Sequence, residues 1–118
     1  MYTGINSDLI NSYAWDTAIL FIEKYLGDED YSRQTTLQSS LANTGKATDG
    51  TNYDLRCNIY DMAGNCLEWT TETSSTSSNP CVVRGGYCNN SQYFTSDRNS
   101  GNTSSGSIND SFRSLLYW

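Results

Sequence analysis

The sequence has no histidine, one proline and only seven lysine and arginine residues, against thirteen aspartate and glutamate residues. Because histidine is absent and no Cys-x-x-Cys pair occurs, we expect no zinc site of the usual ligand set. The net charge of −6 repels nucleic-acid phosphates and anionic membrane surfaces, and no basic patch offsets it. No apolar run approaches the roughly 18 residues of a membrane-spanning helix. We therefore expect neither nucleic acid nor membrane insertion among its interactions.

What the sequence does contain is sufficient for one modest core. At 118 residues the chain has the length of a single domain. Hydrophobic residues make up only 36% of it, while aromatic residues make up 13%. The core should therefore depend on the three tryptophans and nine tyrosines.

A helix is predicted over residues 8–25. Asn6 or Ser7 would cap its amino end, and Gly27 follows in the position that carboxyl-terminal caps prefer. Trp15 lies within it, where packing in the core is favoured over a role as a ligand platform. The apolar stripe at steps of three and four residues consists of Leu9, Ile10, Tyr13, Ala14, Ala18, Phe21, Ile22 and Tyr25.

Polar stretches follow this helix. The acidic run 28–30 and the oxygen-rich run 48–54 are the two candidate sites for structural calcium, which needs about six to eight converging oxygens. Adjacent carboxylates usually supply only one or two of these, so solvated loops are the favoured interpretation. A short helix is predicted over 34–42, and an irregular loop over 45–53.

The stretch 56–70, RCNIYDMAGNCLEWT, organises the rest of the chain. Strand-forming residues flank the turn Ala63-Gly64-Asn65, which predicts a hairpin. Glycine and asparagine in this turn both suit a backbone with positive φ.

Further strands are predicted at 81–83 and at the end of the chain. The pair Gly85-Gly86 after the first of them indicates a bulge or a close approach of backbone segments. In the terminal strand, Phe112, Leu115 and Leu116 are expected to enter the core.

Three motifs resemble those of the formylglycine-generating-enzyme/sulfatase-modifying-factor superfamily. Residues 58–69 match N-x-x-D-M-x-G-N-x-x-E-W, residues 83–86 match V-R-G-G, and residues 111–113 resemble the closing G-F-R. The resemblance covers chiefly the C-terminal half. It implies an α+β, C-type-lectin-like fold with mostly antiparallel short strands, an N-terminal helix and long loops.

The same resemblance implies a structural network of motif residues. Within it, Arg113 would pair with Asp61 or Glu68 and position them rather than strongly stabilise the fold. The network consists of Asp61, Asn65, Glu68, Trp69, Arg84 and Arg113.

Four cysteines lie between positions 57 and 88. Cys57 and Cys81 each precede a predicted core strand, so a disulfide between them would fasten the two strands together. Such a bridge would stabilise the fold by roughly 3 kcal/mol in the chain-entropy model. Buried thiols in a reducing compartment are the alternative. Cys66 and Cys88 either pair with each other or remain free.

The enzymes of the superfamily need groups that this chain has only in part. In the formylglycine-generating oxidases, two copper-binding cysteines follow the R-G-G motif closely, whereas this chain has only Cys88 there. The related iron-dependent sulfoxide synthases require histidines, and the sequence has none. We therefore expect a non-catalytic protein without a cofactor, and an oxidase relative is the alternative.

Residues 86–110 form the predicted ligand-binding segment. The superfamily includes non-catalytic variable proteins of diversity-generating retroelements, whose diversified segment runs from the R-G-G strand to near G-F-R. Adenine substitution converts Asn codons into Ser, Tyr, Asp, Gly, Thr, Cys or Phe codons, and nearly every residue from 87 to 109 belongs to that set. Tyr, Ser, Gly and Asn also dominate antibody-type binding loops.

Aromatic residues would anchor the ligand within this segment, because buried aromatic side chains dominate binding energies. Tyr93 and Phe94 are the expected anchors. The full set of expected contact residues is Tyr87, Asn89, Asn90, Tyr93, Phe94, Asp97, Arg98, Asn99 and Asn102.

The sequence thus predicts a single ligand-binding domain displayed on a phage tail or a bacterial surface. Its ligand would be a protein or glycan on a cell surface, and the domain would form a homo-oligomer or attach to a larger fibre. No secretory leader is visible, so export is expected to depend on a longer precursor or on virion assembly. A structural tip domain of a fibre is the alternative, and it predicts that the loop surface tolerates substitution.

Overall fold

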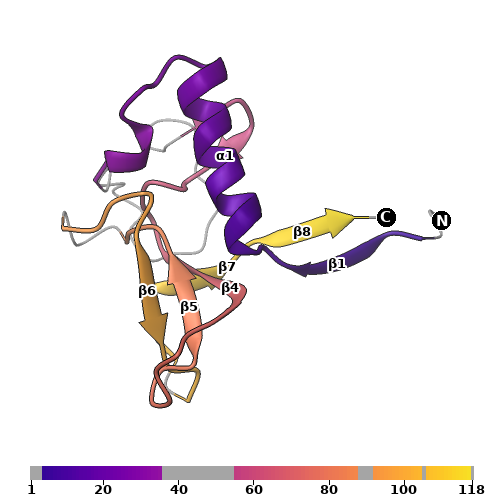
Figure 1. Ribbon diagram of the computed structural model, residues 1–118, viewed down its shortest axis with the longest axis vertical. Helices are drawn as coiled ribbons and strands as arrows, with labels where there is room; N and C mark the ends of the chain where they lie inside the picture. Colours follow the sequence, from indigo (N-terminus) through magenta and orange to yellow (C-terminus); the bar gives the residue numbers. More distant parts are fainter. Residues whose placement is uncertain (1–3, 36–54, 88–91, 105, 118) are drawn as a thin grey trace.

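The computed structural model describes residues 4–35, 55–87, 92–104 and 106–117, which contain one α-helix and eight strands (Figure 1). In chain order the elements are β1 Asn6–Leu9, α1 Ser12–Tyr25, the 3-10 helix η1 Tyr31–Arg33, β2 Leu55–Arg56, β3 Ile59–Tyr60, β4 Leu67–Thr73, β5 Cys81–Arg84, β6 Arg98–Gly101, β7 Asp110–Phe112 and β8 Ser114–Tyr117. The protein therefore belongs to the α+β class, as the sequence predicts.

The described strands form three separate sheets. A four-stranded sheet has the order β6-β5-β4-β7, in which β4 pairs antiparallel with β5 and parallel with β7. Strands β2 and β3 form a short hairpin, and β1 pairs with β8. Figure 1 shows α1 above the four-stranded sheet and the β1–β8 ribbon projecting to one side, with both chain ends at its tip.

Helix α1 begins four residues later than predicted, at Ser12. Asn11 is its N-cap, and its side-chain oxygen accepts a hydrogen bond from the Ala14 N–H at 2.8 Å. Residues 6–9 pair with 114–117 instead of starting the helix, so the predicted cap at Asn6 or Ser7 is wrong. A partner strand more than a hundred residues away decides this boundary. The helix does end at Tyr25, and Gly27 adopts φ +75°, as its C-terminal position requires.

The face of α1 that enters the core differs in part from the predicted stripe. Trp15, Ile19 and Ile22 are buried, whereas Tyr13 and Tyr25 are 87% and 79% exposed. The core cluster that α1 covers comprises Ile10, Trp15, Ile19, Ile22, Tyr31, Met62 and Ala63. The buried face therefore runs through Trp15, Ile19 and Ile22 at steps of four and three residues, with Ala14 and Ala18 packed at its side.

Trp15 is the centre of this core. It is fully buried, and its indole N–H donates to the Thr95 carbonyl at 3.1 Å. A Cβ atom on Gly85 would lie 3.0 Å from the Trp15 ring and 3.0 Å from the Met62 carbonyl oxygen. The predicted packing role of Trp15 and the predicted close backbone approach at Gly85 are both confirmed.

The hairpin of the motif 56–70 forms in a different place from the predicted one. The turn lies at Cys57-Asn58, where φ is +50° and +64°, a pattern typical of a two-residue type I′ hairpin. It joins β2 to β3, while β4 pairs with β5 and β7 rather than with β3. Asn65 does adopt positive φ, at +65°. The residues of the motif are therefore divided between two sheets.

The predicted disulfide between Cys57 and Cys81 does not form, since both are free thiols. Cys57 lies in the exposed turn between β2 and β3, whereas Cys81 is the first residue of β5 in the four-stranded sheet. Cys66 is buried, with its thiol 4.0 Å from the Ile108 carbonyl oxygen. Cys88, its proposed partner, lies outside the described residues.

The terminal strands enter the core less than predicted. Phe112 and Leu116 are each 67% exposed, and Leu115 is half-buried. These residues belong to β7 and to the projecting ribbon, which the body of the protein does not cover (Figure 1). The hydrophobic side chains of Phe112, Leu115 and Leu116 predicted burial, but a side chain is buried only where another part of the protein packs against that side of its strand.

Candidate functional site

The register of the four-stranded sheet divides its side chains into two faces. Glu68 lies opposite Arg84, which lies opposite Arg98 on the next strand. One position along, Trp69 lies opposite Val83, which lies opposite Asn99. Because directly paired residues share a face and successive residues alternate, the first row forms one face and the second row the other. We call them the inner face, toward α1, and the outer face.

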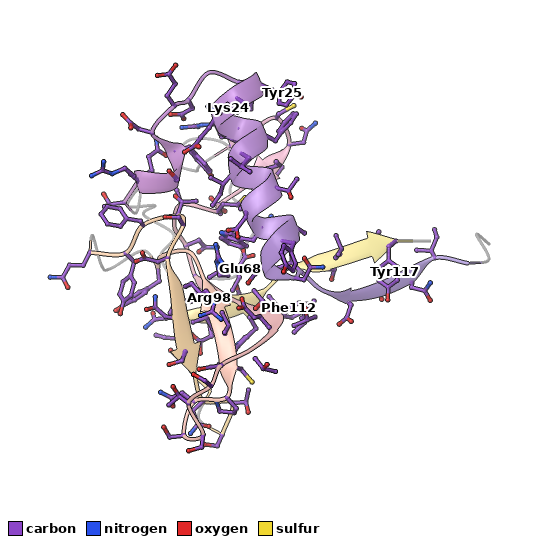
Figure 2. The ribbon with its side chains drawn as sticks, in the orientation of Figure 1. Lys24, Tyr25, Glu68, Arg98, Phe112 and Tyr117 are labelled. Atoms are coloured by element: carbon purple, nitrogen blue, oxygen red, sulfur yellow. The ribbon has the colours of Figure 1, made fainter. Side chains whose placement is uncertain are left out.

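The inner face contains one of the two ion pairs predicted for Arg113, the one with Glu68. The guanidinium of Arg113 donates to both carboxylate oxygens of Glu68, at 2.9 and 2.8 Å, and to the Tyr60 carbonyl at 2.6 Å. It also lies 6.0 Å from the centre of the Trp15 ring. Figure 2 places Glu68 between α1 and the sheet. Arg113 thus connects the closing motif to the central motif and to the core.

Burial raises the pKa of the Glu68 carboxyl, and the Arg113 guanidinium opposes this rise. The nearby Asp61 charge contributes a smaller upward shift. The carboxylate is therefore costly to keep ionised, and Arg113 is the group that compensates it.

Two further arginines of the inner face are paired. Buried Arg84 forms an ion pair with Asp16 of α1 and donates to the Ser96 carbonyl at 3.3 Å. Arg98 pairs with Glu72, which also accepts from the Ser12 hydroxyl of α1. These hydrogen bonds, that of Arg98 first, lower the pKa of Glu72. The inner face is therefore a charged layer that attaches the helix to the sheet.

The outer face is built around Trp69. A Cβ atom on Gly101 would lie 2.6 Å from Cη2 of the Trp69 ring, so only glycine leaves room for the ring at that position. The ring thus extends from β4 across β5 to β6, beside the buried Val83.

A hollow of about 340 Å³ opens over this ring, and we call it the Trp69 hollow. Three of the sequence-predicted ligand residues line it, namely Tyr93, Asn99 and Asn102. The described lining residues are Leu67, Trp69, Val83, Tyr93, Asn99, Ser100, Gly101, Asn102, Ser107 and Asp110. Its volume is at the lower end of the range of small-ligand sites.

Two polar groups of the hollow are in unusual surroundings. The Asn99 side-chain Nδ2 atom is buried, and no described group accepts a hydrogen bond from it. Burial raises the pKa of the Asp110 carboxyl. A buried donor without an acceptor is unfavourable, and a rotation of the Asn99 side chain that brought Nδ2 to a ligand oxygen in the hollow would relieve it.

The other predicted contact residues have different surroundings. The rings of Tyr87 and Tyr93 lie 5.5 Å apart, so these two are brought together. Asp97 accepts a hydrogen bond from the Phe94 N–H at 3.0 Å and closes the turn before β6. Arg98 lies on the inner face, paired with Glu72 (Figure 2). Phe94 is 38% exposed, whereas Asn89 and Asn90 lie outside the described residues.

The sequence-based prediction gave Trp69 a structural role only and did not include Asp110. The alternation of residues in β4 could have indicated that Trp69 faces away from the structural network, because Leu67 and Trp69 share one face of the strand and Glu68 lies on the other. To predict Asp110 as a site residue, one would need to know that β7 pairs parallel with β4, because this pairing places Asp110 opposite Leu67. Sequence alone does not show that pairing.

Nothing in the described part of the chain gathers three or more cysteine, aspartate or glutamate side chains into a group that could hold a metal ion. Asp28, in the first calcium candidate, instead accepts a hydrogen bond from Arg56 at 3.0 Å. The second candidate, 48–54, and most of the predicted helix 34–42 lie outside the described residues. No helix in the described ranges has the length and apolar character needed to cross a membrane.

Comparisons with known proteins concern the fold. No protein-family model matches the chain, and a search of curated proteins finds no match. The crystal structure of CarF is similar, with a TM-score of 0.60 and 18% sequence identity over 93% of this chain. The match covers 46% of the CarF chain, so this chain spans less than half of that protein. The likeness shows a shared α+β chain fold and leaves function to be argued from the site.

Proposed function

We propose that this protein is a non-catalytic ligand-binding domain with a C-type-lectin-like fold, which presents residues 86–110 to a ligand on a cell surface. The observation that carries the proposal is the Trp69 hollow. It brings Tyr93, Asn99 and Asn102, which are far from Trp69 in sequence, over one aromatic ring. Aromatic walls with a few polar groups are typical of binding sites.

The division of the sheet supports binding rather than a purely structural role. Structural residues of the motifs, including Glu68 and Arg84, lie on the inner face and pair with other protein groups. The outer face instead carries Asn99, whose buried Nδ2 has no acceptor among the described residues. The inner-face Arg84 also has a buried Nε without an acceptor, but its Nη2 is paired with Asp16, whereas the Asn99 Nδ2 has no described partner.

Display on a phage tail or bacterial surface follows from the resemblance to retroelement variable proteins. Sequencing of the locus in close isolates tests this origin. We expect substitutions confined to adenine positions between Gly86 and Asp110, next to a reverse transcriptase gene and a template repeat. An invariant segment without such a cassette would exclude diversification and leave a binder of fixed specificity.

Binding of the fluorescently labelled domain to intact bacterial cells tests the site itself. We expect Tyr93→Ala and Asn99→Ala to reduce bound fluorescence at least tenfold. Tyr25→Ala and Asn6→Ala, which alter exposed residues of α1 and β1, are the matched controls and should bind as the unchanged protein does. Equal binding by all four variants would contradict the proposed site.

A further inference from the structure

The outer face contains a second hollow next to the first. It has a volume of about 380 Å³, and we call it the Phe112 hollow. Trp69, Ser107 and Asp110 line both hollows, so they form the boundary between them. On its far side the second hollow is lined by Leu9, Thr103 and Phe112. The two together form a row across β6, β5, β4 and β7.

We propose that this row binds a neutral carbohydrate, with one pyranose ring in the Trp69 hollow and the adjoining ring in the Phe112 hollow. The inference rests on the proposed function and names its ligand class. It is carried by three features of the row: its aromatic surfaces, its polar groups and its lack of cationic side chains.

The aromatic surfaces suit the C–H faces of a sugar ring. Trp69 is half-buried and lines both hollows, and Tyr93 lines the first. Phe112 is 67% exposed in the second. The face of an aromatic ring is electron-rich and attracts the weakly positive C–H groups of a pyranose. Gly101 keeps the Trp69 ring in its position, because any side chain there would displace it.

The polar groups suit hydroxyls, which both donate and accept. The Asn99 Nδ2 donor is buried and has no acceptor in the described part of the chain, and a rotation of this side chain toward the hollow would give it a sugar oxygen as acceptor. The Asp110 carboxylate accepts only, and a sugar O–H would donate to it. A hydrocarbon ligand would leave both groups desolvated without a partner, which is unfavourable.

The charge of the row favours a neutral ligand. Neither hollow has lysine or arginine among its described lining residues, and Asp110 is their only charged side chain. Arg84 and Arg98 are paired on the inner face. An anionic sugar would therefore meet a carboxylate without a compensating cation, in a protein whose net charge is −6.

The test is an NMR titration of the whole domain with neutral methyl glycosides of glucose, galactose, mannose and N-acetylglucosamine, and with maltose and lactose. The readouts are the Trp69 indole N–H signal, assigned with Trp69→Phe, and the Asn99 side-chain NH₂ signals. We expect one monosaccharide configuration to shift both signals with a dissociation constant on the order of 1 mM, and a disaccharide to bind at least fivefold more tightly.

The matching methyl uronate should bind at least fivefold more weakly than the neutral glycoside. Asn99→Ala should weaken binding at least tenfold, and Asn6→Ala is the matched control on β1. If no neutral glycoside at 100 mM shifts either signal, the carbohydrate proposal is overturned. If cell binding still depends on Tyr93 and Asn99 in that case, the proposed function stands with another ligand class. If cell binding is also absent or independent of them, both proposals fail.

Discussion

The two faces of the four-stranded sheet are made from adjacent residues of the same strands, yet they differ in nearly every chemical respect. On the inner face, Glu68, Arg84 and Arg98 each form an ion pair, with Arg113, Asp16 and Glu72 respectively. On the outer face, Trp69, Val83 and Asn99 lie beside two hollows without a paired charge among the described residues. Alternation in a strand separates the two sets completely.

This difference indicates a division between folding and binding. Charges on the inner face connect α1, the central motif and the closing motif, so their loss should affect stability. Groups on the outer face have few protein partners, so their loss should affect a ligand more than the fold. Four predictions test this division, from the largest expected effect to the smallest.

Arg113→Ala should have the largest effect on stability. It leaves the buried Glu68 carboxylate without its cation, which typically costs about 3–5 kcal/mol. The Glu68 pKa, already raised by burial, would rise further, so acidification should neutralise the group and reduce the loss. Urea unfolding at pH 7 and pH 4 measures both effects. Arg33→Ala, which alters an exposed residue of η1, is the control, and a loss that does not shrink at pH 4 would contradict the interpretation.

Gly85→Ala should destabilise by about 3 kcal/mol, from left-handed backbone strain and overpacking together. Gly85 has φ +78° and its Cβ would lie 3.0 Å from both Trp15 and Met62. Gly27→Ala is a matched control, because its φ is +75° but nothing lies within 4 Å. It should lose only about 1–2 kcal/mol. Equal losses in thermal or urea unfolding would show that the close approach to Trp15 contributes nothing.

Gly101→Ala tests the outer face and should destabilise by roughly 1–3 kcal/mol, since its Cβ would displace the Trp69 ring. The Trp69 indole signal should shift, and cell binding should fall by more than the change in the folded fraction explains. Gly106→Ala, whose Cβ would have open space, is the control for stability. Because Gly106 lines the Phe112 hollow, Asn6→Ala on exposed β1 is the control for binding. Unchanged binding by Gly101→Ala would show that the position of the Trp69 ring is irrelevant to the ligand.

Glu72→Gln should have the smallest effect, because water screens this partly exposed pair. The folded protein lowers the pKa of Glu72 through Arg98 and Ser12, so the carboxylate stabilises the fold above its ordinary pKa of 4.5. That contribution is lost as the pH falls through the lower folded-state pKa. Urea midpoints from pH 7 to pH 3 should therefore converge between the variant and the unchanged protein. For the control Glu29→Gln, in the exposed loop, the difference in urea midpoint from the unchanged protein should stay constant from pH 7 to pH 3.

Much of the candidate site could be predicted from the sequence, but its assembly could not. The motifs narrowed the partner of Arg113 to Asp61 or Glu68, and loop composition identified Tyr93, Asn99 and Asn102 as contact residues. Composition could not separate these residues from Arg98, which is also a polar residue of the segment 86–110 but lies on the inner face, paired with Glu72. The neighbours of a strand residue depend on register, which local sequence does not contain.

Boundaries and pairings were the least predictable features, because distant segments decide them. Residues 6–9 were predicted to cap and begin the helix, but they pair with β8 at the other end of the chain. The glycine–asparagine turn of the motif suggested a hairpin, but β4 finds better partners in β5 and β7. In each case a long-range strand pairing overrides a local preference.

By itself, the sequence determined the α+β class, the end of α1 at Tyr25, the packing role of Trp15 and the choice of Asp61 or Glu68 as the partner of Arg113. Those features depend on local periodicity, side-chain size and charge, which each residue carries with it. Only the tertiary structure decided that the Cys57 and Cys81 thiols are apart, that Arg98 faces inward and that Trp69 meets Gly101. These depend on which strands lie side by side, and the chain settles that only when it folds.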